Sequence, residues 1–153
     1  LAGPEGVNPA GAGYGSFVKL HKPFFVGRAA YIAAEQERTH EIVRFRVGAT
    51  GVRMARTGDP VVNSRGAFIG RVTSAVMAGG CQVGMAYVDR RYTAPGARIA
   101  VFAVSGQPEA RKPIAAADLT PGDRVALPIE AVVIERFLTP KTVEPKVELR
   151  ATT

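Results

Sequence analysis

The sequence predicts a mainly β protein: a small antiparallel β-barrel of about six or seven strands, preceded by a loop, a short strand and one helix. After residue 40, apolar and polar residues alternate with a period of two, as they do in half-buried strands. Clusters of Gly, Pro, Asn and Asp separate these segments at short intervals, which is typical of small barrels and sandwiches. The chain has 153 residues, 46% of them hydrophobic and 22% charged, which suits one domain with a buried core.

Residues 1–38 are expected to lead into the barrel. Residues 1–15 are rich in glycine, alanine and proline and indicate a loop. A short strand is expected over 17–20, and Pro23 disfavours helix in the residues before it. The alanine-rich stretch "GRAAYIAAEQER" predicts a helix over 27–38. Its buried side is expected to contain Ala30, Ala33 and Ala34 beside Phe25 and Val26.

Residues 39–138 are expected to form the barrel domain and 139–153 an extended tail. The first strand, "EIVRFRV" from residue 41, places Phe45 on the face opposite to Arg44 and Arg46. Asn63–Gly66 predicts a hairpin turn, and Thr73-Ser74 is taken as the end of the strand that follows. Residues 105–119 predict a long loop. Further strands are expected over 59–62, 67–76, 82–88, 98–104, 124–127 and 130–135.

The positive charge is concentrated in the first two thirds of the chain. Residues 1–102 contain 13 Lys and Arg against 6 Asp and Glu, a net charge of +7, whereas residues 103–153 contain 7 of each. Such a field favours an anionic partner, namely a polycarboxylate, a phosphate, an acidic protein face or nucleic acid. A solvated, arginine-rich surface without a partner is equally compatible with it.

No residue pattern indicates a catalytic or metal centre. His21 and His40 have no acidic residue at ligand spacing, so no metal site is expected. The chain lacks the G-x-S-x-G pattern of a hydrolase nucleophile. Cys81, the single cysteine, is expected to be a small buried residue rather than a reactive thiol.

The cysteine count and the lengths of the apolar stretches indicate the cellular compartment. One cysteine permits no disulfide within the chain, and no apolar stretch is long enough for a membrane span. We therefore expect a reducing, cytoplasmic, bacterial-type location without membrane contact. The start at Leu1 is taken as a sign that the sequence is a piece of a longer protein. A basic barrel that binds single-stranded nucleic acid is an alternative, but the aromatic residues are poorly placed for base stacking, so nucleic acid is not the favoured partner.

Four segments in order resemble the C-terminal part of the glycine-cleavage T-protein (aminomethyltransferase) family. They are "NPAGAGYGSFVKLHKPFFVGRAAY", "HEIVRFRV", "RTGDPVVNSRGAFIGRVTSAV" and "VGMAYVDRRYTAPGARIAVF". Together they cover roughly residues 7–104, with a weaker likeness over 124–138. The resemblance implies a C-terminal β-barrel that completes a cleft formed mainly by upstream domains.

The resemblance also implies a function for the whole protein. That protein would take an aminomethyl group from a lipoyl-bearing H-protein and leave the one-carbon unit on tetrahydrofolate. The essential acidic residue and most pterin contacts would lie in upstream domains, so this chain supplies no catalytic residue. Related proteins use the same architecture in folate-linked demethylases and as the tail of amine oxidoreductases, which remain alternatives.

Five basic residues are the candidate site residues under this resemblance. Lys22, Arg28 and Arg136 are the candidates for tetrahydrofolate contacts, and Arg90 and Arg91 for docking the H-protein. The chain departs from the family pattern at Gly11, where an acidic residue is common, and at Ser16, where tryptophan is common. We expect the full-length protein to bind tetrahydrofolate and this chain alone to bind little.

Overall fold

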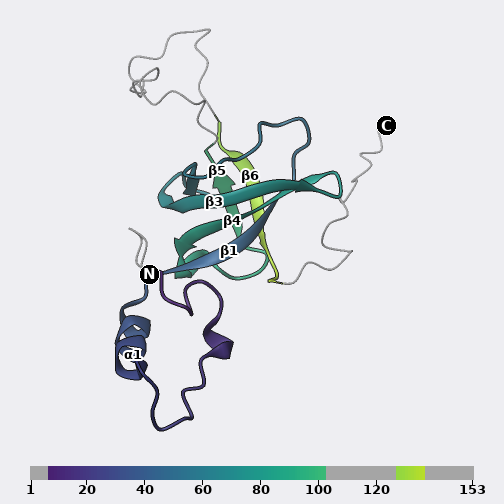
Figure 1. The fold of residues 1–153 in the computed structure, drawn as a ribbon. Helices are drawn as coiled ribbons and strands as arrows, with labels where there is room; N and C mark the ends of the chain where they lie inside the picture. The colour runs from purple at the N-terminus through teal and green to yellow at the C-terminus, as the bar shows by residue number, and fades with distance from the viewer. Residues whose placement is uncertain (1–6, 103–126, 137–153) are drawn as a thin grey trace.

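Six antiparallel strands close into a barrel in the part of the chain that the computed structural model describes, residues 7–102 and 127–136 (Figure 1). The order around the barrel is β1-β4-β3-β2-β5-β6, with β6 returning to β1. This architecture confirms the predicted fold class. In chain order the elements are η1 (Gly15–Phe17), α1 (Arg28–Glu37), β1 (His40–Val47), β2 (Pro60–Val62), β3 (Phe68–Ala78), β4 (Cys81–Asp89), η2 (Arg90–Tyr92), β5 (Arg98–Val101) and β6 (Ile129–Ile134).

Strand β1 closes the barrel and supplies the centre of its core. It pairs with β4 along one edge and with β6 along the other. Val43, Phe45 and Val47 point inward and are buried, and Phe45 has no exposed surface. Arg44 and Arg46 alternate with them on the outer side, as the period of two predicts. The other fully buried large side chains are Val61, Val72, Val88, Val101 and Val133, β-branched residues that suit a pleated surface.

The turn between β2 and β3 is closed by the side chain of Asn63. Its Oδ1 accepts hydrogen bonds from the backbone N–H groups of Arg65 and Ala67, at 2.9 and 3.0 Å. Gly66 has a φ of +78°, a left-handed conformation that glycine adopts without steric cost. The predicted hairpin turn at Asn63–Gly66 is therefore confirmed.

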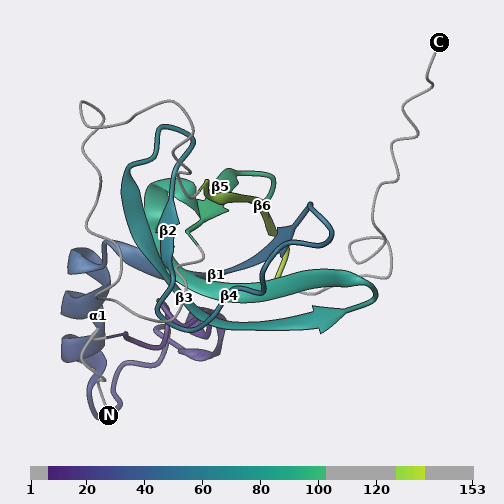
Figure 2. The same ribbon diagram turned by 90° about the horizontal axis from the view of Figure 1, so that it is seen from above.

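Strand β3 does not end at Thr73-Ser74, contrary to expectation. It continues to Ala78 and pairs with β4 in a ribbon that extends beyond the barrel (Figure 2). Val72 lies opposite Ala86 and Ser74 opposite Met85, so Thr73 is an extra residue, as in a β-bulge. The Thr73 carbonyl accepts a hydrogen bond from the Thr57 hydroxyl at 2.9 Å. The inserted residue shifts the alternation of side chains between the two faces, and a break of this kind resembles a strand end in the sequence.

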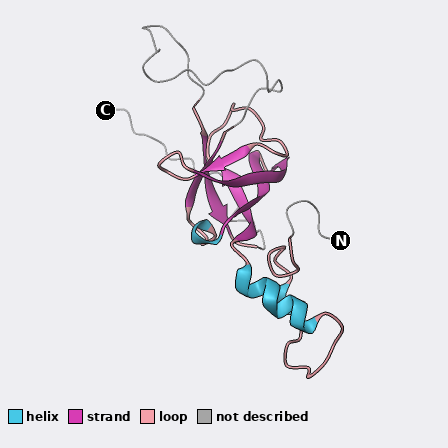
Figure 3. Cartoon of the chain, turned by 90° about the vertical axis from the view of Figure 1, so that its left-hand side faces the viewer, coloured by secondary structure: helices cyan, strands magenta, loops and turns pink. Residues whose placement is uncertain are grey.

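The segment before the barrel differs from the prediction in two ways. The short strand expected over 17–20 is absent, and the 3₁₀-helix η1 followed by turns stands there instead. The helix α1 forms as expected, but none of its residues is buried. Ala30, Ala33 and Ala34, expected to line its buried side, are exposed, because α1 projects from the barrel (Figure 3). No helix among the described residues has the length and apolar character needed to cross a membrane.

Some predictions fall outside the described residues. These are the loop over 105–119, the tail over 139–153 and the strand over 124–127, except for Leu127, which is described and belongs to no strand. The domain boundaries at residues 38 and 138 stay predictions.

Gly84 of β4 leaves the space that Phe45 fills, so a methyl group there should destabilise the barrel. An added Cβ would lie 2.5 Å from Phe45 Cζ and 2.6 Å from the Ser74 carbonyl oxygen. We expect Gly84→Ala to lower the free energy of unfolding by about 1–3 kcal/mol, measured by urea denaturation. Gly48→Ala is the matched control, because nothing lies within 4 Å of its added Cβ. Equal stability of the two variants would contradict the packing argument.

Candidate functional site

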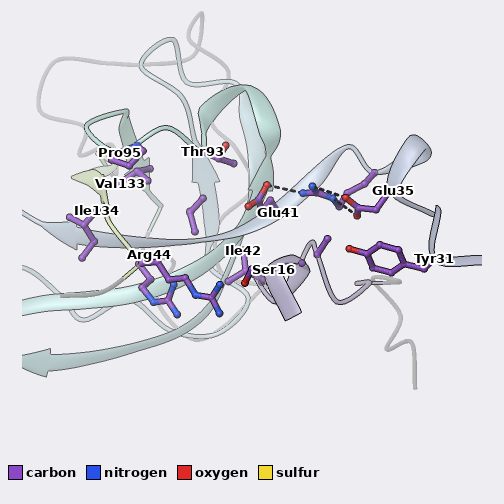
Figure 4. Close-up of a pocket in the computed structure, with 16 residues that line it drawn as sticks. Ser16, Tyr31, Glu35, Glu41, Ile42, Arg44, Thr93, Pro95, Val133 and Ile134 are labelled. Atoms are coloured by element: carbon purple, nitrogen blue, oxygen red, sulfur yellow. Dashed lines mark hydrogen bonds and ion pairs between the residues drawn. The ribbon is translucent and has the colours of Figure 1, made fainter. Parts of the chain in front are cut away.

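A cleft of about 560 Å³ lies between the residues that precede β1 and the outer side of the barrel (Figure 4). Strands β1 and β6 form one wall of it, and α1 with the loop around Tyr14 forms the other. Its charged and aromatic lining residues are Tyr31, Glu35, Arg38, Glu41, Arg44 and Arg136, and the ring of Tyr14 contacts Arg136. The cleft is the candidate site because it combines three guanidinium groups with two tyrosine rings.

Arg38 joins the helix to the barrel. Its Nε lies 2.8 Å from Glu35 Oε1 on α1, and its Nη1 lies 2.7 Å from Glu41 Oε2 on β1 (dashed lines in Figure 4). Asn8 extends the network, since its Nδ2 donates to Glu35 Oε1 at 2.8 Å and its Oδ1 accepts from the N–H of Gly11 at 2.7 Å. A backbone hydrogen bond of 2.7 Å from Ile42 to the Gly11 carbonyl then ties this loop to β1. These contacts fix the width of the cleft.

The network also shifts the pKa of Glu35 and of Arg38. Burial by itself would raise the pKa of Glu35, but hydrogen bonds from Arg38 and Asn8, together with the positive charge of Arg38, lower it below its ordinary value. Burial alone would lower the pKa of Arg38, and its hydrogen bonds to Glu35 and Glu41 outweigh this and raise it. Glu35 is therefore ionised at neutral pH and bound to Arg38, which makes it a poor general base.

Arg44 and Arg136 add positive charge to the cleft. The Arg136 guanidinium lies over the ring of Tyr14, 5.2 Å from its centroid, a cation–π contact between the barrel and the loop. Arg44 projects from the outer side of β1 next to Ile42 and Ser16 (Figure 4). With three arginines against two glutamates among its lining residues, the cleft has a net charge of +1. Both glutamates are held by Arg38, so this arrangement suits an anionic ligand beside Arg44 and Arg136.

The structure separates the three residues predicted to contact a cofactor. Arg136 lines the cleft, whereas Lys22 and Arg28 do not. Lys22 is exposed in a turn before α1, and Arg28 starts α1 and donates from Nη2 to the Leu20 carbonyl at 3.2 Å. Arg28 Nε is buried without a hydrogen-bond partner among the described residues. The predicted set is therefore not one cluster.

Arg90 and Arg91, predicted to dock a partner, make local contacts in the short helix η2. Arg90 donates to the Arg38 carbonyl at 3.4 Å. Arg91 pairs with Asp89 at 2.6 Å, although 77% of its side chain is exposed. The Asp89 carboxylate also accepts the backbone N–H of Arg91 at 2.9 Å. The pair leaves the 89–91 segment with a net charge of +1, and partner docking there stays a prediction.

Several site residues were missed because their role depends on folding. Arg38 stands three residues after Glu35 and three before Glu41, a spacing that permits ion pairs on a helix. That spacing was visible in the sequence and a strand was expected from Glu41, but the pattern does not show that this strand forms the wall opposite the helix. Tyr14 and Asn8 lay in a segment predicted only as a loop.

Cys81 is buried, as expected, and its Sγ donates to the Ala78 carbonyl at 3.2 Å. Within the described residues, no three His, Cys, Asp or Glu side chains gather as metal ligands would.

Comparisons with known proteins agree on one family. The family model of the glycine cleavage T-protein C-terminal barrel domain matches residues 40–117. An aminomethyltransferase of Streptomyces coelicolor is 41% identical over 95 residues, which are 59% of this chain and 25% of that protein. One of Saccharopolyspora erythraea is 38% identical over 99 residues, 62% of this chain and 26% of that protein. The chain thus spans about a quarter of the length of the curated relatives it matches.

A solved structure shows the same fold. It is the crystal structure of glycine cleavage system aminomethyltransferase T from Bartonella henselae, with a TM-score of 0.59 and 18% sequence identity. The match covers 84% of this chain and 31% of that one. At this sequence identity the match supports a shared fold only. None of these comparisons supports the alternative of a nucleic-acid-binding module.

Removing Arg38 should loosen the contact between the helix and the barrel. Arg38→Met leaves two carboxylates in the cleft without their shared cation, and we expect the Ile42 amide, which bonds to Gly11, to exchange about tenfold faster. Hydrogen exchange followed by NMR measures this. Glu37→Gln, on an exposed position of the same helix, is the control and should leave exchange unchanged. Unaltered protection of Ile42 in Arg38→Met would show that the network does not hold the loop.

The Asp89–Arg91 pair predicts acid sensitivity. Hydrogen bonds from the side chain and backbone of Arg91 lower the pKa of Asp89 from 3.8 to about 2. Because the folded pKa is depressed, the contribution to stability is complete above pH 3.8 and is lost as the pH falls towards about 2. We expect Asp89→Asn to flatten the dependence of the unfolding midpoint on pH in this window, measured by circular dichroism. Glu130→Gln on β6 is the control, and the prediction fails if both variants keep the parent's pH dependence.

Proposed function

The chain belongs to the glycine cleavage T-protein C-terminal barrel domain family, and we propose that it forms one wall of a tetrahydrofolate cleft in a larger aminomethyltransferase. The observation that carries this proposal is the cleft beside β1, where Arg44, Arg136 and the ring of Tyr14 meet. The remaining walls would come from parts of the protein outside this chain, which spans a quarter of its relatives' length.

The residues in the cleft fit part of tetrahydrofolate. That molecule ends in a glutamate with two carboxylates, attached to an aromatic ring. Arg44 and Arg136 would hold the carboxylates, because guanidinium groups match carboxylates in charge and geometry. Tyr14, which already lies under the Arg136 guanidinium, would contact the aromatic ring. When bound, tetrahydrofolate accepts the one-carbon unit.

This chain would contribute positioning rather than acid–base chemistry. Glu35 and Glu41 are the carboxylates of the cleft, and both are hydrogen bonded to Arg38. A rigid wall that orients one reactant accelerates a reaction by reducing the freedom lost in the transition state. Arg38 would serve this role indirectly, since it holds the loop and helix against β1.

The proposal also covers the donor of the aminomethyl group and the cellular compartment of the protein. The aminomethyl group would arrive on a lipoyl-bearing H-protein, with Arg90 and Arg91 at its docking surface. The exposed guanidinium of Arg91 supports this assignment, while its pairing with Asp89 reduces the charge available. We place the protein in a reducing, cytoplasmic compartment, which agrees with the buried thiol of Cys81.

Isothermal titration of the full-length protein with tetrahydrofolate tests the assignment of the cleft. We expect Arg44→Ala and Arg136→Ala each to weaken binding about 10-fold, since each removes a charge-assisted hydrogen bond. Arg65→Ala, on the exposed turn between β2 and β3, is the matched control and should bind as the parent does. The 153-residue chain alone should bind little.

The chemical form of the ligand makes the test specific. The losses should disappear with 6-methyltetrahydropterin, which has no carboxylate, because Arg44 and Arg136 are assigned to the carboxylates of the glutamate. If both variants bind tetrahydrofolate like the parent, these arginines do not line the folate site. If they lose affinity for both compounds equally, the contact is with another part of the cofactor.

A further inference from the structure

We propose that two copies of this protein pair through the open edge of strand β3, in a two-fold arrangement centred on Val76. The paired segment is residues 74–78, which we call the ribbon edge. It belongs to the ribbon of β3 and β4 that extends beyond the barrel (Figure 2). The inference rests on the strand pairing and the charge pattern of this ribbon, and it is independent of the folate cleft.

The ribbon edge has a neighbouring strand on one side only. Each residue from Ser74 to Ala78 pairs with a residue of β4. Strand β2 accompanies β3 only as far as Arg71. Within the described ranges, no other strand lies along residues 74–78. An edge of this kind presents backbone N–H and C=O groups that a further strand can bind.

The alternation along β3 identifies the backbone groups at this edge. Val72 exchanges hydrogen bonds of 2.9 and 2.8 Å with the loop at residues 58–59, away from β4. The bulge that follows Val72 moves the alternation by one position. Ala75 and Met77 are therefore the residues whose N–H and C=O groups face the open edge, whereas those of Val76 face β4.

The ribbon lacks the charges that usually protect an open strand edge. Residues 72–88 contain no Lys, Arg, Asp, Glu or His, although the chain has 20 Lys and Arg and 13 Asp and Glu. Val76 and Met77 are each 56% exposed. Edge strands of monomeric proteins are commonly protected by charged side chains or proline. An apolar edge without them favours pairing with another strand.

The ribbon has a defined conformation before any partner binds. Gln82 of β4 is buried, and its Oε1 accepts a hydrogen bond from the backbone N–H of Ala55 at 2.6 Å. Its Nε2 donates to the Arg53 carbonyl at 3.4 Å. The loop before β2 thus supports the start of β4, directly opposite Met77. A preformed edge loses less conformational freedom when it pairs.

Charge selects a second copy of this chain as the partner. The chain has a net charge of +7, so two copies repel each other where their basic residues face. At the ribbon edge neither copy contributes a charge. Two copies can therefore approach there without repulsion, whereas an acidic partner would find no cation to bind.

A two-fold axis at Val76 makes the ribbon edge complementary to itself. Antiparallel pairing then places Val76 opposite the partner's Val76, and Ala75 opposite the partner's Met77. The outward backbone groups of Ala75 and Met77 meet in this register, so they satisfy each other in both copies. The small side chain of Ala75 also leaves room for the larger one of Met77. An interface that uses the same surface of both copies is the kind that a two-fold dimer requires.

Sedimentation analysis of the full-length protein tests the proposal. We expect the mass to rise from that of one copy to that of two between about 1 and 100 μM. Val76→Lys should raise the dissociation constant about tenfold or more, because it places two like charges directly opposite each other. Val132→Lys is the matched control, since Val132 is 36% exposed on β6 of the barrel, and it should dimerise as the parent does.

Cysteine cross-linking tests the register. Val76→Cys should form a disulfide between two copies under mild oxidation, because residues at such a position have Cα atoms about 4.5 Å apart, within the range of a disulfide. Met85→Cys is the control, since Met85 is 37% exposed but lies on β4, away from the axis. Cys81 is buried and is present in every variant.

Three outcomes would overturn the proposal. They are a parent protein that stays monomeric over the whole range, equal dimerisation of the parent and Val76→Lys, and a cross-link in Met85→Cys that forms as fast as in Val76→Cys. Titration with tetrahydrofolate separates this proposal from that of the folate cleft. Val76 does not line the cleft, so Val76→Lys should lose dimerisation and bind tetrahydrofolate as the parent does.

Discussion

The pairing of β1 on both of its edges is the constraint on which the rest of the structure depends. With β4 on one side and β6 on the other, β1 makes a closed barrel of what would otherwise be an open sheet with exposed edges. Alternation along this strand sends Phe45 into the core and Arg44 to the outer side. The same strand thus provides the centre of the hydrophobic core and the wall of the candidate site. The barrel therefore sets the position of the β1 wall of the cleft.

The three arginines of the cleft have two different roles. Arg38 pairs with both Glu35 and Glu41 and thereby joins α1 to β1. It therefore acts as a structural cation, and Arg44 and Arg136 are the arginines that we propose for ligand contacts. An arginine suits the first role because its planar group can contact two carboxylates at once while keeping its charge. A carboxylate at position 11, common in the family, would lie against Asn8 and Arg38, because even a Cβ there approaches them to 3.1 and 3.2 Å.

The local pattern predicted the barrel strands well and the segment before them poorly. The period of two places Phe45, Arg44 and Arg46 correctly, because the partners of β1 lie within the chain. The alanines of α1 were assigned to a buried side on the assumption that the barrel would cover them, and it does not. Residues 17–20, expected to form a strand, pair with no strand in the described part of the chain. Arg136 was placed in the cleft through the family resemblance, whereas Arg38 and Tyr14 could not be identified without knowing which loops meet.

The contact between Gly84 and Phe45 has a consequence for evolution in this family. Gly84 and Phe45 lie opposite each other on neighbouring strands. The Phe45 ring fills the space that a side chain at position 84 would need. Neither residue can drift alone without leaving a void or a clash. A smaller side chain at 45 would remove only one of the two obstacles, since the Ser74 carbonyl oxygen still lies 2.6 Å from a Cβ at 84, so position 84 should stay glycine even where 45 varies.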